Sequence, residues 1–295
     1  MKNAQEHGAI TITPRPNSFL INGPAVISFS GGRTSAYMLW RILQAHGGAL
    51  PEDLVVAFAN TGREMPATLD FVARCGTEWN VGITWLEYRH EGNGPQVDVV
   101  SHNSASRDGT PFRQLLKAKG YMLPDPMRRY CTEQLKVLTV KRYLMQNLGW
   151  SRWTNIVGLR ADEPDRVALR HADNTSGKYR WHSVMPLDTA GTTETEVLGF
   201  WEEQPFKLHL RKWEGNCNFC FQKRLHQVAR MFEDHPELGD DWIQDEETSA
   251  AKGYNGRYRA DRPSYAQIKK LTQDQGRLPL DPEPAFSDCS VECGV

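Results

Sequence analysis

The stretch Val26-Ile27-Ser28-Phe29-Ser30-Gly31-Gly32-Arg33-Thr34-Ser35-Ala36-Tyr37-Met38 decides the fold of this chain. Residues 25–29 form an apolar run that predicts a short buried strand, and the spacing of apolar residues at 37–43 predicts a helix directly after it. Two glycines and several hydroxyls separate these elements. Such a turn binds phosphate, because the first N–H groups of the helix and its dipole face the anion. The alternative is an ordinary strand-to-helix turn rich in small residues.

The residues of this turn that can hold phosphate offer a hydroxyl, a guanidinium or a closely approaching backbone. They are Ser28, Ser30, Gly31, Gly32, Arg33, Thr34 and Ser35. Their spacing differs from the two common glycine motifs, because it lacks both the Gly-Lys-Ser/Thr ending and the pattern Gly-x-Gly-x-x-Gly.

The composition of the 295 residues is that of an ordinary globular protein, with 39% hydrophobic and 24% charged residues. A formal net charge of −1 excludes a bulk electrostatic attraction to nucleic acid or membranes, although it is compatible with a local basic patch. No apolar run approaches the roughly 20 residues that span a bilayer. The first ten residues lack the apolar centre of a signal peptide, so we expect a cytoplasmic protein without membrane contact.

Apolar strand patterns alternate with helical patterns along the chain. This alternation predicts an α/β fold with a doubly wound, mainly parallel sheet. Further strands are expected at residues 54–60, 83–88 and 154–159, and helices at residues 65–74, 132–148 and 193–203. Two polar stretches predict a loop at 90–109 and an irregular segment at 162–180.

The character of the sequence changes near residue 205, since no buried strand is evident beyond it and helical patterns follow. We therefore expect a helical C-terminal extension. The predicted organisation is a leader at 1–24, a nucleotide-binding α/β domain at 25–205, a helical cysteine-containing region at 206–277 and an extended tail at 278–295.

Two further motifs follow predicted strands. Asn60, Thr61 and Gly62 end the second strand, and a parallel sheet places them beside the phosphate-binding turn. Gly158-Leu159-Arg160-Ala161-Asp162-Glu163-Pro164-Asp165-Arg166 follows the last predicted strand. Its arginines suit phosphate or sulfate, and Asp162 and Glu163 suit Mg²⁺. The alternatives are a glycine turn before a helix and a solvated, salt-bridged loop.

Three of the six cysteines are candidates for metal binding. Cys217 and Cys220 form a Cys-x-x-Cys motif whose sulfurs can share one ion, and Cys131 precedes a predicted helix. Together they suggest a three-cysteine site, in which an iron–sulfur cluster is favoured over Zn²⁺ on ligand chemistry. A redox dithiol or inert core cysteines are the alternatives. The remaining cysteines are Cys75, expected in the core, and Cys289 and Cys293 near the chain end.

These motifs, in this order, resemble those of the phosphoadenosine phosphosulfate reductase-like branch of the PP-loop (ATP pyrophosphatase) superfamily, and the chain is identified as a member. The matching segments are Ser30-Gly31-Gly32-x-x-Ser35, Asn60-Thr61-Gly62 with Pro66 and Thr68, Gly158-Leu159-Arg160 with Arg166, and Cys131 with Lys136. The resemblance implies an adenine nucleotide alpha hydrolase-like fold and a site for ATP, or an adenylyl sulfate nucleotide, with Mg²⁺. Relatives with a [4Fe-4S] cluster have two adjacent cysteines where this chain has Cys131 and Thr132.

The ending Glu292-Cys293-Gly294 resembles the mobile tail of sulfonucleotide reductases, although the histidine of that tail is absent. The resemblance implies that Cys293 attacks a sulfate sulfur, and that Arg160 and Arg166 are the other catalytic residues. Two enzymatic functions compete. We favour adenylation of an acceptor by ATP, with pyrophosphate release, in a sulfur transfer such as nucleic-acid thiolation or phosphorothioation. Thiol-dependent reduction of phosphoadenosine phosphosulfate or adenylyl sulfate is the alternative, and a non-catalytic nucleotide-binding partner is the third.

A basic, aromatic stretch after residue 200 suggests a nucleic-acid partner through charge and stacking. Its residues are Trp201, Lys207, Arg211, Lys212, Trp213, Lys223 and Arg224. A solvated helical face is the alternative. A sulfur-donor protein and a second copy of the chain are further candidate partners.

The substitution Cys293→Ser separates the two enzymatic functions. In the favoured adenylation, pyrophosphate release from ATP stays near the wild-type rate, because the thiol does not contact the phosphates. In the reductase alternative, sulfite production is lost while nucleotide affinity is kept. Parallel assays of pyrophosphate and sulfite on this variant distinguish the two functions. If neither activity changes, the Glu-Cys-Gly ending has no catalytic role.

Overall fold

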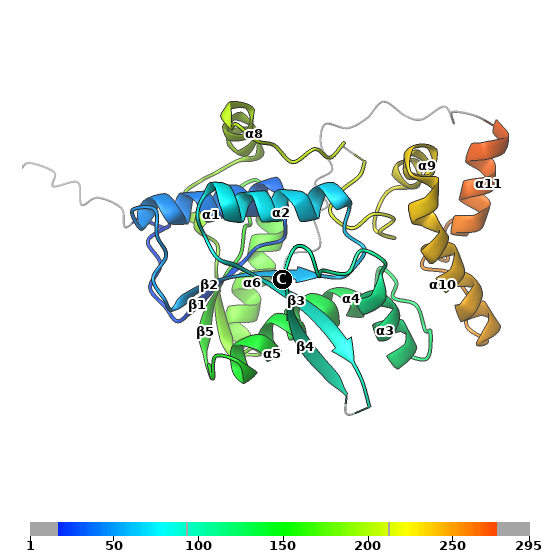
Figure 1. The fold of residues 1–295 in the computed structure, drawn as a ribbon, viewed down its shortest axis with the longest axis horizontal. Helices are drawn as coiled ribbons and strands as arrows, with labels where there is room; N and C mark the ends of the chain where they lie inside the picture. The colour runs from blue at the N-terminus through cyan, green and yellow to red at the C-terminus, as the bar shows by residue number, and fades with distance from the viewer. Residues whose placement is uncertain (1–16, 93, 212, 276–295) are drawn as a thin grey trace, which may run out of the picture.

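The structure is a computed structural model that describes residues 17–92, 94–211 and 213–275. The described residues form one six-stranded sheet in the order β4-β3-β2-β1-β5-β6 (Figure 1). The strands are β1 (Ala25–Ser28), β2 (Leu54–Asn60), β3 (Ile83–His90), β4 (Pro95–Val100), β5 (Trp153–Ile156) and β6 (Trp181–Val184). All neighbouring strands are parallel except β4, which runs antiparallel to β3. The predicted α/β fold with a mainly parallel sheet is therefore confirmed.

Helices cover both faces of the sheet, because successive strand residues point to opposite sides. Ile27 packs in a core with α1 (Arg33–Ala45) and α2 (Pro66–Glu78), whereas Val26 packs in a separate core with α5 (Leu138–Gln146). The winding direction reverses at β1, since β2 and β3 lie on one side of it and β5 and β6 on the other. In doubly wound sheets the ligand crevice opens at this reversal, outside the carboxyl ends of the strands.

The structure differs from the sequence prediction in two polar stretches. Residues 90–109, predicted as a loop, contain β4, whose side chains are half-buried or exposed. Residues 162–180, predicted as irregular, contain α6 (Pro164–Ser176), in which Val167 is the buried residue. β6, the other edge strand, was not predicted either. Edge strands and a surface helix bury few side chains, so they lack the apolar periodicity that identifies the central elements.

The predicted helix at 132–148 corresponds to three consecutive elements. They are α4 (Tyr130–Thr132), the π-helix η1 (Glu133–Val137) and α5. A π-helix has a wider turn than an α-helix, and in η1 the neighbouring residues Leu135 and Lys136 are both buried. The other helices before residue 205 are α3 (Thr110–Ala118), α7 (Pro186–Thr189) and α8 (Glu194–Glu203), the last of which confirms the helix predicted at 193–203.

The predicted helical C-terminal extension is confirmed as well. It consists of α9 (Leu225–Asp234), the short 3₁₀ helix η2 (Pro236–Gly239), α10 (Asp240–Ala251) and α11 (Tyr265–Gln275), which lie beyond one edge of the α/β layers in Figure 1. These helices enclose a second core that contains Phe219 and Trp242 and includes Phe112 of α3. The boundary near residue 205 stays a prediction. Throughout the described ranges, no helix has both the length and the apolar character needed to cross a membrane.

Candidate functional site

The turn between β1 and α1 is closed by hydrogen bonds among its own hydroxyls. The Ser35 Oγ lies 2.9 Å from the Ser30 Oγ and donates to the Gly32 carbonyl oxygen at 3.0 Å. Gly32 is the N-cap of α1, and no side chain in the described part of the chain caps this helix. The first N–H groups of α1 lie at the carboxyl end of β1 without a side-chain cap from the described residues, the position where a helix N-terminus can accept an anion.

The two glycines of this turn have different roles. Gly31 has φ of +77°, and a Cβ there would lie 2.8 Å from the Thr68 methyl group and 3.1 Å from the Phe58 ring. Gly32 has φ of −97°, which any residue adopts, and its closest contact would be the Asn216 amide at 3.3 Å. The positive φ and the close packing against α2 thus require glycine at position 31.

The arginine motif meets the phosphate-binding turn across the reversal of the sheet. Arg160 Nη1 donates to Thr34 Oγ1 at 3.2 Å, although the two residues are 126 positions apart in the sequence. Gly158 allows this approach, since its Cβ position is 3.3 Å from the Ser35 Cα. The loop after β5 therefore packs directly on the N-terminal turn of α1.

Carboxylates hold the two arginines of the motif in place. Arg160 Nε donates to Asp162 at 2.8 Å, its backbone N–H donates to Glu163 at 3.0 Å, and Arg166 forms an ion pair with Glu163. Partial burial works against ionisation of Asp162, but hydrogen bonds from the Glu194 N–H and from Arg160 outweigh it and lower the pKa of this carboxyl. Asp162 is therefore a carboxylate at neutral pH. The site has two arginines and two carboxylates, a set that can bind phosphoryl oxygens and a divalent cation.

The loop after β2 uses most of its polar groups to hold its own shape. Asn60 Nδ2 donates to Glu87 at 2.6 Å, and the Asn60 Oδ1 accepts from the Gly62 N–H at 3.1 Å. Thr61 donates to Glu64 through both its N–H and its hydroxyl, each at 2.9 Å. Burial raises the pKa of Glu64, and the positive charge of Lys136 opposes this rise. These hydrogen bonds hold the loop in this shape without a ligand.

The segment around the Cys-x-x-Cys motif connects this loop to the phosphate-binding turn. Asn216 Nδ2 donates to the Ser30 carbonyl at 3.0 Å, and the Asn216 carbonyl accepts from the Met65 N–H at 2.8 Å. Cys217 pairs with Glu64 in an isolated β-bridge. Sequence reasoning missed Asn216, whose only signal is its position directly before the first cysteine of the motif.

The three cysteines predicted to bind a metal line one cavity. Cys131, Cys217 and Cys220 surround it together with Thr61 and Lys136, and its volume is about 30 Å³. This space accommodates roughly two water molecules. Within the described ranges, no three His, Cys, Asp or Glu side chains are arranged to hold a metal ion. The soft donor set fits zinc or an iron–sulfur cluster, and binding requires the thiols to move toward one another.

Several predicted site residues point elsewhere. Ser28 Oγ donates to Asn155 on the neighbouring strand at 2.7 Å, and the Arg33 guanidinium donates to the Leu208 carbonyl at 2.8 Å. Cys293, with the ending around it, lies outside the described residues. Of the basic, aromatic stretch, Trp201 lies in the core and Lys223 is buried. That stretch therefore does not form one continuous exposed face.

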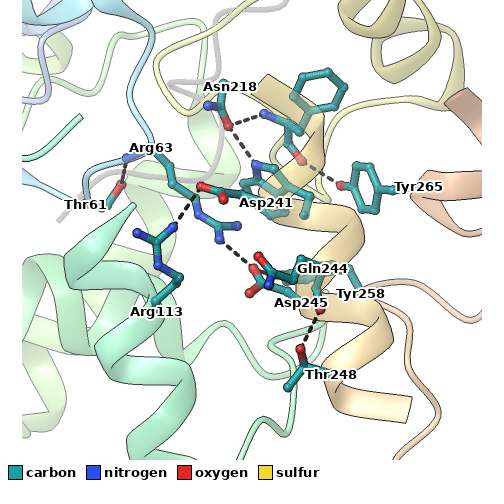
Figure 2. A network of polar contacts seen from close by, with 12 residues as sticks. Thr61, Arg63, Arg113, Asn218, Asp241, Gln244, Asp245, Thr248, Tyr258 and Tyr265 are labelled. Carbon is teal, nitrogen blue, oxygen red and sulfur yellow. Dashed lines mark hydrogen bonds and ion pairs between the residues drawn. The ribbon is translucent and has the colours of Figure 1, made fainter. Parts of the chain in front are cut away.

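A buried ion pair joins the loop after β2 to the helical extension. Arg63 Nη2 lies 2.6 Å from Asp245 Oδ2 of α10, and both side chains are nearly inaccessible to solvent. Figure 2 shows this contact beside the ion pair of Arg113 with Asp241, which measures 3.0 Å. The Arg63 guanidinium stacks between Phe112 and Trp242, at 4.3 and 4.5 Å from the ring centres. Its Nε and Nη1 have no hydrogen-bond partner in the part of the chain that the structure describes.

The fold and the site define an α/β protein whose mainly parallel sheet carries a glycine-containing turn before α1, an arginine motif and a cysteine cavity. No protein-family profile matches the chain. Over 223 residues it is 30% identical to the uncharacterized nin region protein ORF290 of Escherichia phage lambda, a match that covers 72% of this chain and 71% of the phage protein. The chain belongs to the family of this phage protein.

Two further similarities are weaker. The chain is 22% identical over 225 residues to the uncharacterized protein MJ0066 of Methanocaldococcus jannaschii. This match covers 75% of this chain but 41% of MJ0066. Among solved structures, the U34-tRNA thiolase NcsA from Methanococcus maripaludis with its [4Fe-4S] cluster covers 90% of this chain and 79% of its own, at 12% identity and a TM-score of 0.40. A TM-score of this size is too low to transfer the activity or the cluster of that protein to this chain.

The buried ion pair provides a stability test. Arg63→Met leaves the Asp245 carboxylate buried and unpaired, so we expect a loss of about 3–5 kcal/mol in the free energy of unfolding, measured in urea. The matched control is Arg74→Met, which removes an exposed i,i+4 pair with Glu78 and should cost about 0.5 kcal/mol. Equal losses for both variants contradict the structural role of Arg63.

The two glycines provide a second test. Gly31→Ala forces an L-residue into positive φ against Thr68, and we expect it to lower the free energy of unfolding by more than about 1 kcal/mol. Gly32→Ala requires only a small shift of the Asn216 amide and should change stability by less than half as much. If position 32 is the more sensitive of the two, the assigned backbone geometry of the turn is wrong.

Proposed function

We propose that the chain is a PP-loop enzyme, of the phosphoadenosine phosphosulfate reductase-like branch, that uses ATP to adenylate an acceptor and releases pyrophosphate in a sulfur transfer. The observation that carries this proposal is the 3.2 Å hydrogen bond from Arg160 Nη1 to Thr34 Oγ1. It brings a guanidinium to the N-terminal turn of α1, at the reversal of the sheet. Positive charge and helix N–H groups that converge there suit a polyphosphate.

Different residues of the crevice would bind the phosphates, the Mg²⁺ and the nucleoside of ATP. The N–H groups of the first turn of α1 and the hydroxyls of Ser30, Thr34 and Ser35 would hold the phosphates. Asp162 and Glu163 are the carboxylates at the site that can bind Mg²⁺, and both also orient Arg160. The ribose and adenine would lie toward the loop after β2, where Gly62 has φ of +78°.

The proposed reaction develops negative charge on the leaving pyrophosphate near the two arginines. An acceptor oxygen bonds to the α-phosphorus of ATP, and the bond from that phosphorus to pyrophosphate breaks. Negative charge grows on the leaving pyrophosphate, and Arg160 and Arg166 would stabilise it as fixed donors. A sulfur nucleophile then replaces the activated oxygen, which leaves with AMP.

The cysteine cavity would hold the metal centre, with Cys131, Cys217 and Cys220 as ligands. An iron–sulfur cluster held by these cysteines would supply redox chemistry. The chain itself ties this cavity to the nucleotide crevice, because Asn216 bonds the Ser30 carbonyl and Thr61 lines the cavity. This connection favours a reaction in which nucleotide activation and sulfur chemistry occur next to each other.

Reduction of an adenylyl sulfate nucleotide is the second candidate. The observation that favours it is the segment Glu292-Cys293-Gly294, which resembles the thiol-bearing segment of sulfonucleotide reductases. The same phosphate-binding turn and arginines would hold the nucleotide in both reactions.

Arg160→Lys tests the role of the guanidinium. The ammonium group keeps the charge but cannot bond Thr34 and Asp162 at the same time, so we expect pyrophosphate release to fall by on the order of 10²–10³. Arg74→Lys, at an exposed position on α2, is the control and should leave the rate unchanged. If Arg160→Lys releases pyrophosphate at a near-normal rate, the arginine motif is only a structural ion-pair network.

Metal analysis tests the cysteine cavity. Protein purified without oxygen should contain iron and acid-labile sulfide, and Cys217→Ser and Cys220→Ser should each lose them. Cys75→Ser is the control, because Cys75 lies in the main core away from this cavity, where burial raises the pKa of its thiol. Zinc in place of iron supports the same ligands with the other metal, whereas protein without either metal contradicts the proposed centre.

A further inference from the structure

A second pocket opens at the opposite end of the sheet from the candidate nucleotide crevice. Trp153 and Trp181 are the first residues of β5 and β6 and pair in register. Because both strands run parallel to β1, their first residues lie at the amino end of the sheet, whereas the phosphate-binding turn lies at the carboxyl end. The pocket has a volume of about 740 Å³, which falls within the range of ligand sites.

The charge of this pocket is of one sign. Arg152, Lys178 and Arg180 line it, and among the residues that the structure describes no Asp or Glu does. Neither Arg152 nor Arg180 forms an ion pair within the described ranges, and both are exposed. In a chain with a formal net charge of −1, these three cations make a local positive patch at the pocket, and Asp173 and Glu133 act on Lys178 from outside its lining.

A column of three aromatic rings forms the wall of the pocket. Trp153 and Trp181 stack with ring centres 5.4 Å apart and an angle of 21° between the rings. Tyr179 stacks on Trp181 at 4.6 Å and 17°. The Lys178 ammonium lies 5.0 Å from the centre of the Tyr179 ring. Tyr179 thus ends the column, with the Lys178 ammonium over its ring.

We propose that this pocket binds single-stranded nucleic acid. A base takes the place of the Lys178 side chain on the Tyr179 ring, and the displaced ammonium turns to a phosphate. Arg152 and Arg180 contact the neighbouring phosphates of the same strand. Aromatic rings stack on any base whose face is exposed, and cations that flank such rings follow the phosphate backbone. A single strand offers exposed base faces, whereas a duplex does not. This site is independent of the proposed adenylation, because none of its residues belongs to the nucleotide crevice.

The test measures the affinity of the full chain for a fluorescein-labelled, 12-nucleotide single strand by fluorescence anisotropy, with DNA and RNA probes. Tyr179→Ala should weaken binding about tenfold, and Tyr179→Phe should retain it, because the ring still stacks. The double variant with Arg152→Ala and Arg180→Ala should lower the slope of log affinity against log salt by about 1.4, the value for two phosphate contacts of a single strand.

Matched controls separate these effects from general loss of charge or folding. Tyr254→Ala removes an exposed tyrosine of the helical region, and the double variant Arg74→Ala, Arg89→Ala removes two arginines elsewhere that form surface ion pairs. Both controls should bind the strand as the wild type does, and all variants should keep the wild-type urea midpoint. Arg160→Lys should also keep strand binding. The strand-binding assay therefore gives a result that does not depend on whether the adenylation proposal is correct.

Three results would overturn the proposal. The first is equal affinity and equal salt slope for the wild type, Tyr179→Ala and the double arginine variant. The second is binding of a duplex as tight as that of the single strand, which assigns the pocket to backbone recognition alone. The third is full competition by AMP at a concentration close to that of the strand, which makes the pocket a mononucleotide site.

Discussion

The ion pair between Arg63 and Asp245 is the constraint on which the candidate site depends. Removing either partner of a buried ion pair leaves an uncompensated buried charge, so α10 must lie where the loop after β2 places Arg63. The backbone carbonyl of Arg63 also accepts a hydrogen bond from the Asn218 N–H at 2.8 Å. One residue thereby fixes both the helical extension and the segment that carries the Cys-x-x-Cys motif. The aromatic rings of Phe112 and Trp242 exclude water from this contact, which strengthens the attraction between the charges.

From this anchor, a chain of contacts runs to the candidate site. Asn216 contacts the turn after β1 through its side chain and the loop after β2 through its backbone, so the two halves of the candidate site cannot move independently without breaking one of these hydrogen bonds. Cys217, the residue after Asn216, lines the cysteine cavity, and Ser30 lies two residues before Gly32, the N-cap of α1. The contacts of Asn216 thus link the segment that carries the Cys-x-x-Cys motif to the turn between β1 and α1.

The central part of this fold can be predicted from sequence, because β1, β2 and α1 bury apolar side chains at the spacing of their secondary structure. β4, α6 and β6 bury few, and their sequences carry no such signal. The motifs likewise singled out Arg160 and the Cys-x-x-Cys pair, which the structure places at the turn before α1 and at the cysteine cavity, while their roles stay predictions. Sequence could not show that Arg33 turns away to the Leu208 carbonyl or that Asn216 contacts Ser30, since each partner lies more than 170 residues away. The sequence gives the position of a side chain next to a glycine motif, but the direction of that side chain depends on the tertiary fold.

The π-helix η1 has a consequence for the evolution of the cysteine cavity. It lies between Cys131, which lines the cavity, and α5, which packs under the sheet through Val140 and Leu144. A wide turn of this kind equals one residue inserted into an α-helix. Loss of that residue would restore regular α-helix and rotate everything before it by about 100° relative to α5. Since α5 is fixed by the sheet, the rotation would fall on Cys131 and carry its thiol out of the cavity. A relative with a one-residue deletion in this turn should therefore no longer need a cysteine at this position, which makes length here as informative as residue identity.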